Sequence, residues 1–211
     1  MFSRRAVASA ERAQEKETAE AGQRAQAALR LSTGRDVQYL AALALAFAEN
    51  ASRAQALAAD LAKRFPEDTV VQFNYLPTIH AQLALSHNNS SQSIEALQAT
   101  APYDLGTEGA AGGGAFMPAL HPVYVRGEAY LAGHQGNEAA VEFQKILDHR
   151  GVVLYEPIGA LAHLQLGRAY AMQSDTAKAR AAYQEFLTLW KDADPDIPIL
   201  IAAKAEYAKL Q

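Results

Sequence analysis

The sequence predicts an all-α protein, and three observations lead to that expectation. Half of the 211 residues are hydrophobic and a fifth are charged, which is typical of a globular chain. Alanine makes up roughly a fifth of the sequence while Val and Ile are sparse, a composition that favours closely packed helices. No stretch alternates apolar and polar residues over the length of a strand, and the one possible exception is Val152 to Tyr155.

The predicted helices follow one another with short breaks between them. Good helix formers fill residues 2–31, where Glu20 and Arg24 have the favoured spacing for an ion pair. A turn from Leu31 to Asp36 separates this helix from the rest. Further helices are predicted at 36–48, 51–64, 69–87, 91–100, 118–132, 137–149, 157–172, 176–190 and 197–209. Pro77 falls inside 69–87, so it should kink that helix or mark its true start.

A pattern of small residues recurs four times along the chain. A small residue in one helix is followed by a second one twelve positions later, in the pairs Ala42 and Ala54, Ala81 and Ser93, Gly127 and Ala139, Gly167 and Ala179. Four residues after the second member stand Ala58, Leu97, Phe143 and Tyr183, and four before it stand Asn50, Asn89, Gln135 and Asp175. Two antiparallel helices can cross closely only at small residues, and three of the four preceding residues suit a helix N-cap. The pattern therefore predicts about four helix pairs.

This pattern resembles the tetratricopeptide repeat (TPR). The last two pairs carry the family's small and aromatic residues at Gly127, Tyr130, Ala139 and Phe143, and at Leu166, Gly167, Tyr170, Ala179 and Tyr183. The first two pairs depart from it, with Ala in place of Gly and with Leu45 and Ala84 in place of Tyr. The family's early Trp is missing throughout, and successive repeats are 39, 46 and 40 residues apart where the family has about 34.

The resemblance implies an α-α superhelix, a TPR-like solenoid, over residues 35–194, with a Gly-rich insertion at 103–117. Residues 1–34 would form an N-terminal helix left from a further repeat, and residues 195–211 a C-terminal capping helix. The C-terminal half also resembles the non-catalytic TPR regions attached to bacterial serine/threonine kinases and winged-helix regulators.

In this architecture the first helix of each pair lines a concave groove. The residues expected to line it are Tyr39, Leu43, Phe47, Tyr75, Gln82, His121, Tyr124, Glu128, Leu164, Arg168 and Met172. Aromatic and Met side chains suit an extended peptide or an amphipathic helix, and Tyr124 is expected to be replaceable by Ala without loss of the fold. The alternative is that several of these side chains pack against neighbouring helices. A carboxylate clamp is not expected, because no basic residue stands at its position.

The expected function is that of a non-catalytic scaffold that binds a protein or peptide. One alternative is an oligomerisation or regulatory module of a bacterial signalling protein, in which helix 2–31 makes the contact. A remote alternative is a helical-array enzyme, which would need polar groups converging in one pocket.

Other classes of function find little support in the sequence. No cofactor or metal is expected, because the chain lacks Cys, its histidines lack ligand spacing, and the glycines of 106–115 do not follow a strand. The net charge of −4 disfavours nucleic acid. No signal peptide or membrane-spanning segment is seen, so the expected location is the cytoplasm, or the soluble part of a longer membrane-anchored protein.

Overall fold

The structure is a computed structural model that describes residues 19–106, 120–154 and 156–210. Within these ranges the chain is helical with short connections and contains no strand, as the composition predicts. None of the helices in the described ranges is long and apolar enough to cross a membrane. The Gly-rich stretch and most of the predicted helix 2–31 lie outside the described residues, although 19–31 are helical.

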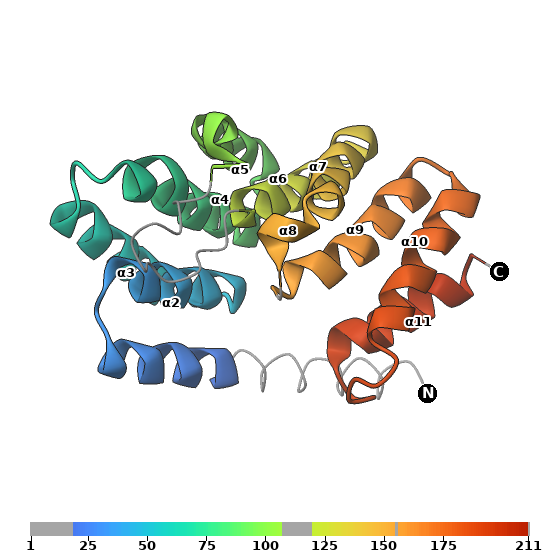
Figure 1. The fold of residues 1–211 in the computed structure, drawn as a ribbon, viewed down its shortest axis with the longest axis horizontal. Coiled ribbons are helices and arrows are strands. Elements are labelled where there is room, and N and C mark those ends of the chain that lie inside the picture. Colours follow the sequence, from blue (N-terminus) through green and yellow to red (C-terminus); the bar gives the residue numbers. More distant parts are fainter. Residues whose placement is uncertain (1–18, 107–119, 155, 211) are drawn as a thin grey trace.

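Eight of the helices form four pairs, each joined by a short turn (Figure 1). The pairs are α2 (Arg35–Phe47) with α3 (Ala51–Arg64), α4 (Leu76–Ser86) with α5 (Ser90–Leu97), α6 (His121–Ala132) with α7 (Gly136–Asp148), and α9 (Ile158–Met172) with α10 (Thr176–Leu189). Three short elements lie between pairs: η1 (Val71–Tyr75), η2 (Gln98–Tyr103) and α8 (Arg150–Val153). Helix α11 (Pro198–Ala208) ends the fold, and residues 19–31 pack beside α2 and α3.

Two local expectations are settled by these elements. The possible strand at Val152 to Tyr155 is wrong, because residues 150–153 form the single helical turn α8. Pro77 is the second residue of α4, where its missing N–H breaks little of the hydrogen-bonding pattern. The chain before it is already helical, as the π turn η1, so the proline follows a widened turn and does not open a gap.

The same turn closes all four pairs. The N–H of the eighth residue after the small residue donates to the carbonyl five positions earlier, at 2.8–3.0 Å, in Asn50 to Leu45, Asn89 to Ala84, Gln135 to Tyr130 and Asp175 to Tyr170. The residue before each donor has a left-handed backbone, with φ of 57° at Glu49, 58° at Asn88, 57° at His134 and 62° at Ser174. This is the Schellman motif, and it stands in one register with the small residues found in the sequence.

Replacing Glu49 with Gly should stabilise the fold by about 1 kcal/mol. A left-handed backbone disfavours every residue with a Cβ, and the exposed Glu49 side chain has no hydrogen bond or ion pair within the described residues that offsets this cost. Chemical unfolding would measure the change, with Ala56→Gly on the exposed side of α3 as control. That control should lose about 1 kcal/mol, because its backbone is helical. Equal destabilisation by both glycine substitutions would show that the left-handed backbone at Glu49 is not strained.

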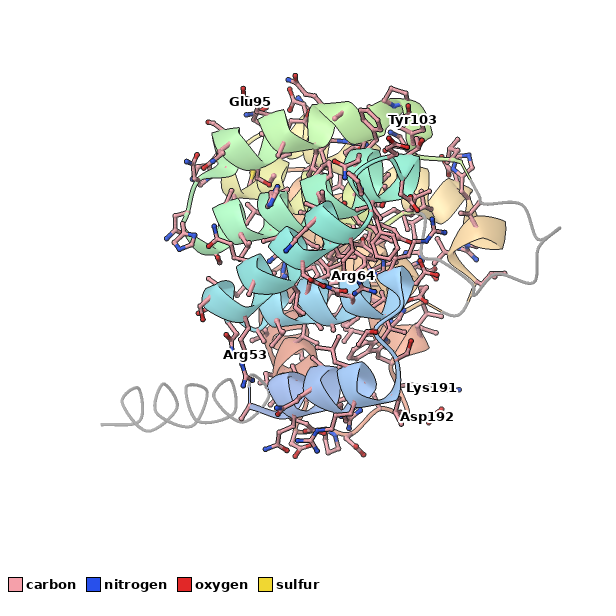
Figure 2. All side chains as sticks on the ribbon, turned by 90° about the vertical axis from the view of Figure 1, so that its left-hand side faces the viewer. Arg53, Arg64, Glu95, Tyr103, Lys191 and Asp192 are labelled. Carbon is pink, nitrogen blue, oxygen red and sulfur yellow. The ribbon has the colours of Figure 1, made fainter. Side chains whose placement is uncertain are left out.

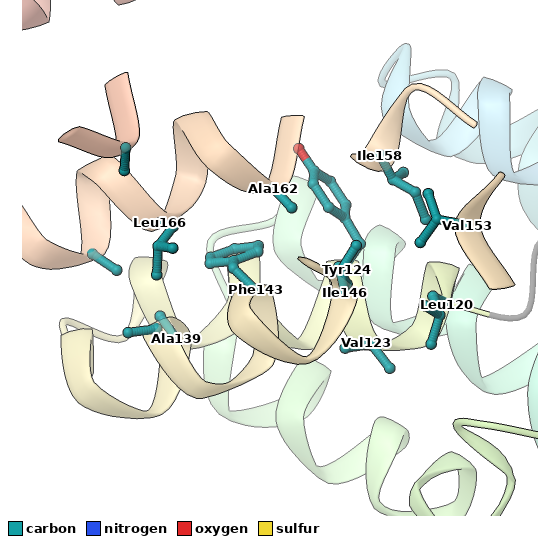
Figure 3. Packing of buried hydrophobic residues seen from close by; sticks show 13 residues of the cluster. Leu120, Val123, Tyr124, Ala139, Phe143, Ile146, Val153, Ile158, Ala162 and Leu166 are labelled. Atoms are coloured by element: carbon teal, nitrogen blue, oxygen red, sulfur yellow. The ribbon is translucent and has the colours of Figure 1, made fainter. Parts of the chain in front are cut away.

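Within each pair the two helices meet at the predicted small residues. A Cβ placed on Gly127 would lie 2.6 Å from the Phe143 ring, and one on Gly167 would lie 2.8 Å from the Tyr183 ring. Ala42 instead shares a buried cluster with Ala58, and Ala81 shares one with Leu97. The residue at the crossing is therefore Gly only in the two pairs whose facing residue on the second helix is aromatic, Phe143 or Tyr183. Figure 3 shows Phe143 inside the largest of these clusters, beside Ala139 and Leu166.

A buried ionic cluster ties the second and third pairs together. The Arg126 guanidinium on α6, 5% exposed, donates to Asp104 Oδ2 at 2.5 Å and to Glu142 Oε2 at 2.7 Å. It also donates to Thr100 Oγ1 at 3.1 Å, and Lys145 Nζ lies 3.0 Å from Asp104 Oδ2. The positive charges of Arg126 and Lys145 thus balance the negative charges of Asp104 and Glu142 where η2, α6 and α7 meet.

Helix α11 packs on α10 at the C-terminal end of the fold. Leu200 and Ala203 are buried in a cluster with Tyr183 and Phe186. Ile201, the residue after Leu200, is largely exposed. Arg53 on α3 and Glu95 on α5, each on the second helix of its pair, point away from the packed helices (Figure 2).

Candidate binding face

The candidate binding face consists of the eleven predicted groove residues. The first helices α2, α4, α6 and α9 carry ten of them, and Tyr75 is the last residue of η1. Six of them are buried: Tyr39, Leu43, Tyr75, Gln82, Tyr124 and Leu164. His121, Glu128 and Arg168 are half-buried. Phe47 and Met172 are 39% and 40% exposed. The first six therefore pack against neighbouring helices, which is the alternative that the sequence left open.

Tyr124 belongs to the core of the fold. Its side chain is buried and its ring meets Phe143 edge to face, with 5.8 Å between the centroids (Figure 3). The expectation that Tyr124→Ala would spare the fold is therefore wrong, because the substitution would leave a cavity in the largest buried cluster.

Aromatic rings connect the first two pairs to the third. The rings of Tyr39 and Tyr75 stack with centroids 3.9 Å apart and planes 6° from parallel. His121 meets Tyr39 edge to face at 6.5 Å. The Tyr75 hydroxyl donates to Asp36 Oδ1 at 2.9 Å, and burial raises the pKa of that hydroxyl well above its usual value. These three predicted residues lie together, and their rings fill the space between helices.

A chain of polar side chains occupies the other half of the face. Gln165 Nε2 on α9 donates to the Tyr124 hydroxyl at 3.1 Å and to Glu128 Oε1 at 2.8 Å, both on α6. Arg168 Nη1 donates to Gln165 Oε1 at 3.2 Å. Polar groups from α6 and α9 thus converge on this part of the face.

The chain of polar contacts continues to the C-terminal helix. Arg168 donates two hydrogen bonds to the Glu206 carboxylate, from Nε to Oε2 at 2.9 Å and from Nη2 to Oε1 at 2.8 Å. The Tyr183 hydroxyl donates to the same carboxylate at 2.7 Å. These contacts hold the pKa of Glu206 below its usual value, in spite of partial burial. This bidentate ion pair holds α11 against α9. It engages Arg168, the one arginine among the predicted groove residues.

Glu128 differs from the other charged groups of this face. Burial raises the pKa of its carboxyl to about 7, although the hydrogen bonds from Tyr124 and Gln165 and the charge of Arg168 act in the opposite direction. Among the described residues no cation lies in hydrogen-bonding contact with it, since Arg168 is engaged by Glu206. Near neutral pH the group is therefore divided between its ionised and neutral forms.

Replacing Glu128 with Gln should stabilise the protein at pH 8 and change little at pH 4. The folded pKa of about 7 lies above the usual 4.5, so the folded state holds an extra proton between those values. Stability from this group is therefore lost as the pH rises through that window, by roughly 1–2 kcal/mol after solvent screening. Melting temperatures from pH 4 to 8 would test this. The exposed Glu138→Gln on α7 is the control, and an identical pH trend in both variants would refute it.

The sequence did not predict the residues that link these networks, among them Gln165, Arg126 and Glu206. Gln165 stands two positions before the small residue, where the other pairs have Leu40, Ile79 and Val125, so a polar residue in an apolar column was the available signal. Arg126 gave a similar signal, one position before Gly127. Glu206 gave none, because its role depends on where α11 lies.

The face carries no recognisable metal site. In the described parts of the chain no three His, Cys, Asp or Glu side chains are grouped so that they could hold a metal ion.

The chain matches no protein-family model, no curated protein and no solved structure. The resemblance to tetratricopeptide repeats therefore depends on the motif residues and on the geometry of the four pairs.

Proposed function

We propose that the protein is a non-catalytic scaffold, a TPR-like superhelix that binds a protein or peptide along its first helices. Three features support this proposal. Each pair closes with the same turn, each pair crosses at the same small residue, and consecutive first helices pack in series, α2 with α4, α4 with α6 and α6 with α9. Stacked pairs of this kind present the first helices as one continuous surface.

The exposure of Phe47 and Met172 carries the proposal. Both stand five residues after the small residue of their pair, one in the first pair and one in the fourth, and both remain about two-fifths exposed. Aromatic and Met side chains are enriched at protein-binding surfaces, where they gain affinity by burial. Two such residues at equivalent positions mark the ends of a surface that a partner would cover.

The double variant Phe47→Ala/Met172→Ala should lose partner binding and keep the fold. The whole chain would first be used to capture partners from the source cell, and a captured protein would then be purified for affinity measurements. The double variant should weaken that affinity by about 2 kcal/mol or more. Val141→Ala is the control, because Val141 is exposed on the second helix α7. Equal loss in the control would place the binding surface elsewhere.

One observation favours the alternative of self-association. Leu31 at the end of the N-terminal helix is 90% exposed, although residues 19–31 pack on the first pair through Ala25. A second copy of the chain could cover that side chain. Sedimentation of wild type and Leu31→Ser would decide, since an oligomer held there should dissociate in the variant.

A further inference from the structure

We propose that the connections between the first three helix pairs carry a separate binding site, which takes an extended, uncharged and proline-containing segment of a partner protein. The site consists of two exposed rings, Phe73 on η1 and Tyr103 on η2, and we call this pair the aromatic edge. Neither ring belongs to the candidate binding face, so the inference does not depend on the proposed function. It is carried by the contact between the rings, by the anchors that hold them and by the lack of charge around them.

The two rings meet on the surface of the molecule. Phe73 is 46% exposed and Tyr103 is 41% exposed, and Figure 2 shows Tyr103 at the surface. The turns η1 and η2 pack against each other, so the ring centroids lie 5.8 Å apart with planes 31° from parallel. Single exposed apolar side chains are common on any protein, whereas exposed apolar side chains that lie together mark binding sites.

Phe73 is held in place by the turn that carries it. Val71 and Tyr75, on either side of it in the chain, are buried. The N–H groups of Val70 and Val71 donate to Asp68 Oδ1 at 3.0 and 3.1 Å and fix the start of the turn. The turn is a π-helix, a rare element that occurs frequently at functional sites. The backbone of Phe73 is thus anchored while its ring remains in contact with solvent.

Tyr103 stands between two buried anchors. Thr100 is fully buried and its hydroxyl donates to the Leu97 carbonyl at 2.9 Å. Asp104 is buried as well and accepts from Arg126. The buried ionic cluster therefore holds η2, although Tyr103 itself is exposed. A tyrosine ring on an anchored backbone has only two side-chain torsions to lose, so little conformational entropy opposes its contact with a ligand.

The surroundings of the two rings are uncharged. Neither η1 nor η2 contains a charged residue. Asp104, which follows η2, is buried and paired with Arg126 and Lys145. The exposed neighbours of Tyr103 in the chain are Gln98, Ala99, Ala101, Pro102 and Leu105. An ionic group of a ligand would lose hydration here and meet no opposite charge, so the matching segment is uncharged.

The area of the aromatic edge limits what it holds. At the exposures given above, two aromatic side chains offer roughly 150–200 Å² together. A stable interface between two proteins needs about 800 Å² on each partner. The aromatic edge is therefore too small to hold a second copy of the chain by itself, and it suits a short segment of a few residues.

A segment in the polyproline II conformation has the chemistry that this surface fits. Proline rings are apolar and stack on aromatic side chains, and the preformed helix loses little entropy on binding. Its backbone carbonyls make no hydrogen bonds within the helix, so they need donors from outside. The Tyr103 hydroxyl has no hydrogen bond within the described ranges of the chain, so it is free to donate to such a carbonyl.

The test titrates the whole chain with a capped polyproline peptide of about nine residues, which forms three turns of the left-handed helix. The same peptide built from D-proline is the matched probe, because it has equal composition and apolarity but the opposite hand. The aromatic ¹³C signals of Phe73 and Tyr103 are the readout. Both signals should shift saturably with the L-peptide and much less with the D-peptide, and raised salt should not weaken the binding.

Substitutions locate the binding on the aromatic edge. The affinity for the L-peptide should fall about tenfold in Phe73→Ala and in Tyr103→Ala. It should fall about threefold in Tyr103→Phe, which keeps the ring and loses only the donor. Leu189→Ala is the control, because Leu189 is an exposed apolar residue of α10. Equal binding of both peptides, no saturable shift, or an unchanged affinity in Tyr103→Ala would overturn the proposal.

Two further outcomes distinguish this site from the other surfaces. Ring signals that move when the chain is diluted without peptide would assign the aromatic edge to self-association and would refute the peptide site. Phe47→Ala/Met172→Ala should leave peptide binding unchanged, and a tenfold loss there would place the peptide on the candidate binding face instead. A failed peptide titration leaves the scaffold function intact, since a captured partner would still depend on Phe47 and Met172.

Discussion

Replacing Arg126 with Met is expected to destabilise the protein by about 3–5 kcal/mol. The substitution keeps an unbranched, largely apolar stem but removes the cation that Asp104 and Glu142 share in a buried site. Lys145 is the one other cation of the cluster, and it is less buried than Arg126. Two carboxylates would then remain next to each other with too little positive charge to offset their desolvation.

A compensated variant separates the charge effect from a packing effect. Combining Arg126→Met with Asp104→Asn and Glu142→Gln removes the stranded charges, so most of the stability should return. Urea unfolding would measure all three proteins. A loss below about 1 kcal/mol in the single variant, or no recovery in the triple one, would show that the cluster does not stabilise the fold as argued.

Adding one methyl group at Gly127 should cost about 1–3 kcal/mol, although Ala is the better helix former. The new Cβ would come within 2.6 Å of the Phe143 ring, which is fully buried and has little room to move. Thermal and urea unfolding of Gly127→Ala would give the value. Gly151→Ala is the control, because no atom lies within 4 Å of a Cβ there.

The second pair of the protein supplies the compensating change. Ala81 and Leu97 stand where Gly127 and Phe143 stand in the third pair. The double variant Gly127→Ala/Phe143→Leu rebuilds that combination, so it should be more stable than the sum of the two single changes predicts. A coupling energy of about 1 kcal/mol or more is expected. Strict additivity would mean that the two residues do not compete for the same space.

The sequence by itself determined the helices and their pairing. The twelve-residue spacing located four crossings, and the residues between its members became four identical turns with Asn89 and Asp175 as N-caps. These features depend on contacts between residues close in the chain, so local propensity and small-residue spacing are enough to predict them. The turn at Arg150–Val153 was missed because four residues are too few for a helical period to appear.

Only the tertiary structure decided which first-helix residues are covered and which polar groups meet. Periodicity assigns Tyr39, Tyr124 and Met172 to one side of their helices, but it does not show how closely the next pair approaches. In the structure that approach buries the two tyrosines and leaves Met172 exposed. Arg126 and Asp104 are likewise 22 residues apart, one on α6 and the other just after η2. Burial and charge pairing arise from the distance between helices that are remote in sequence, and the sequence pattern does not contain that distance.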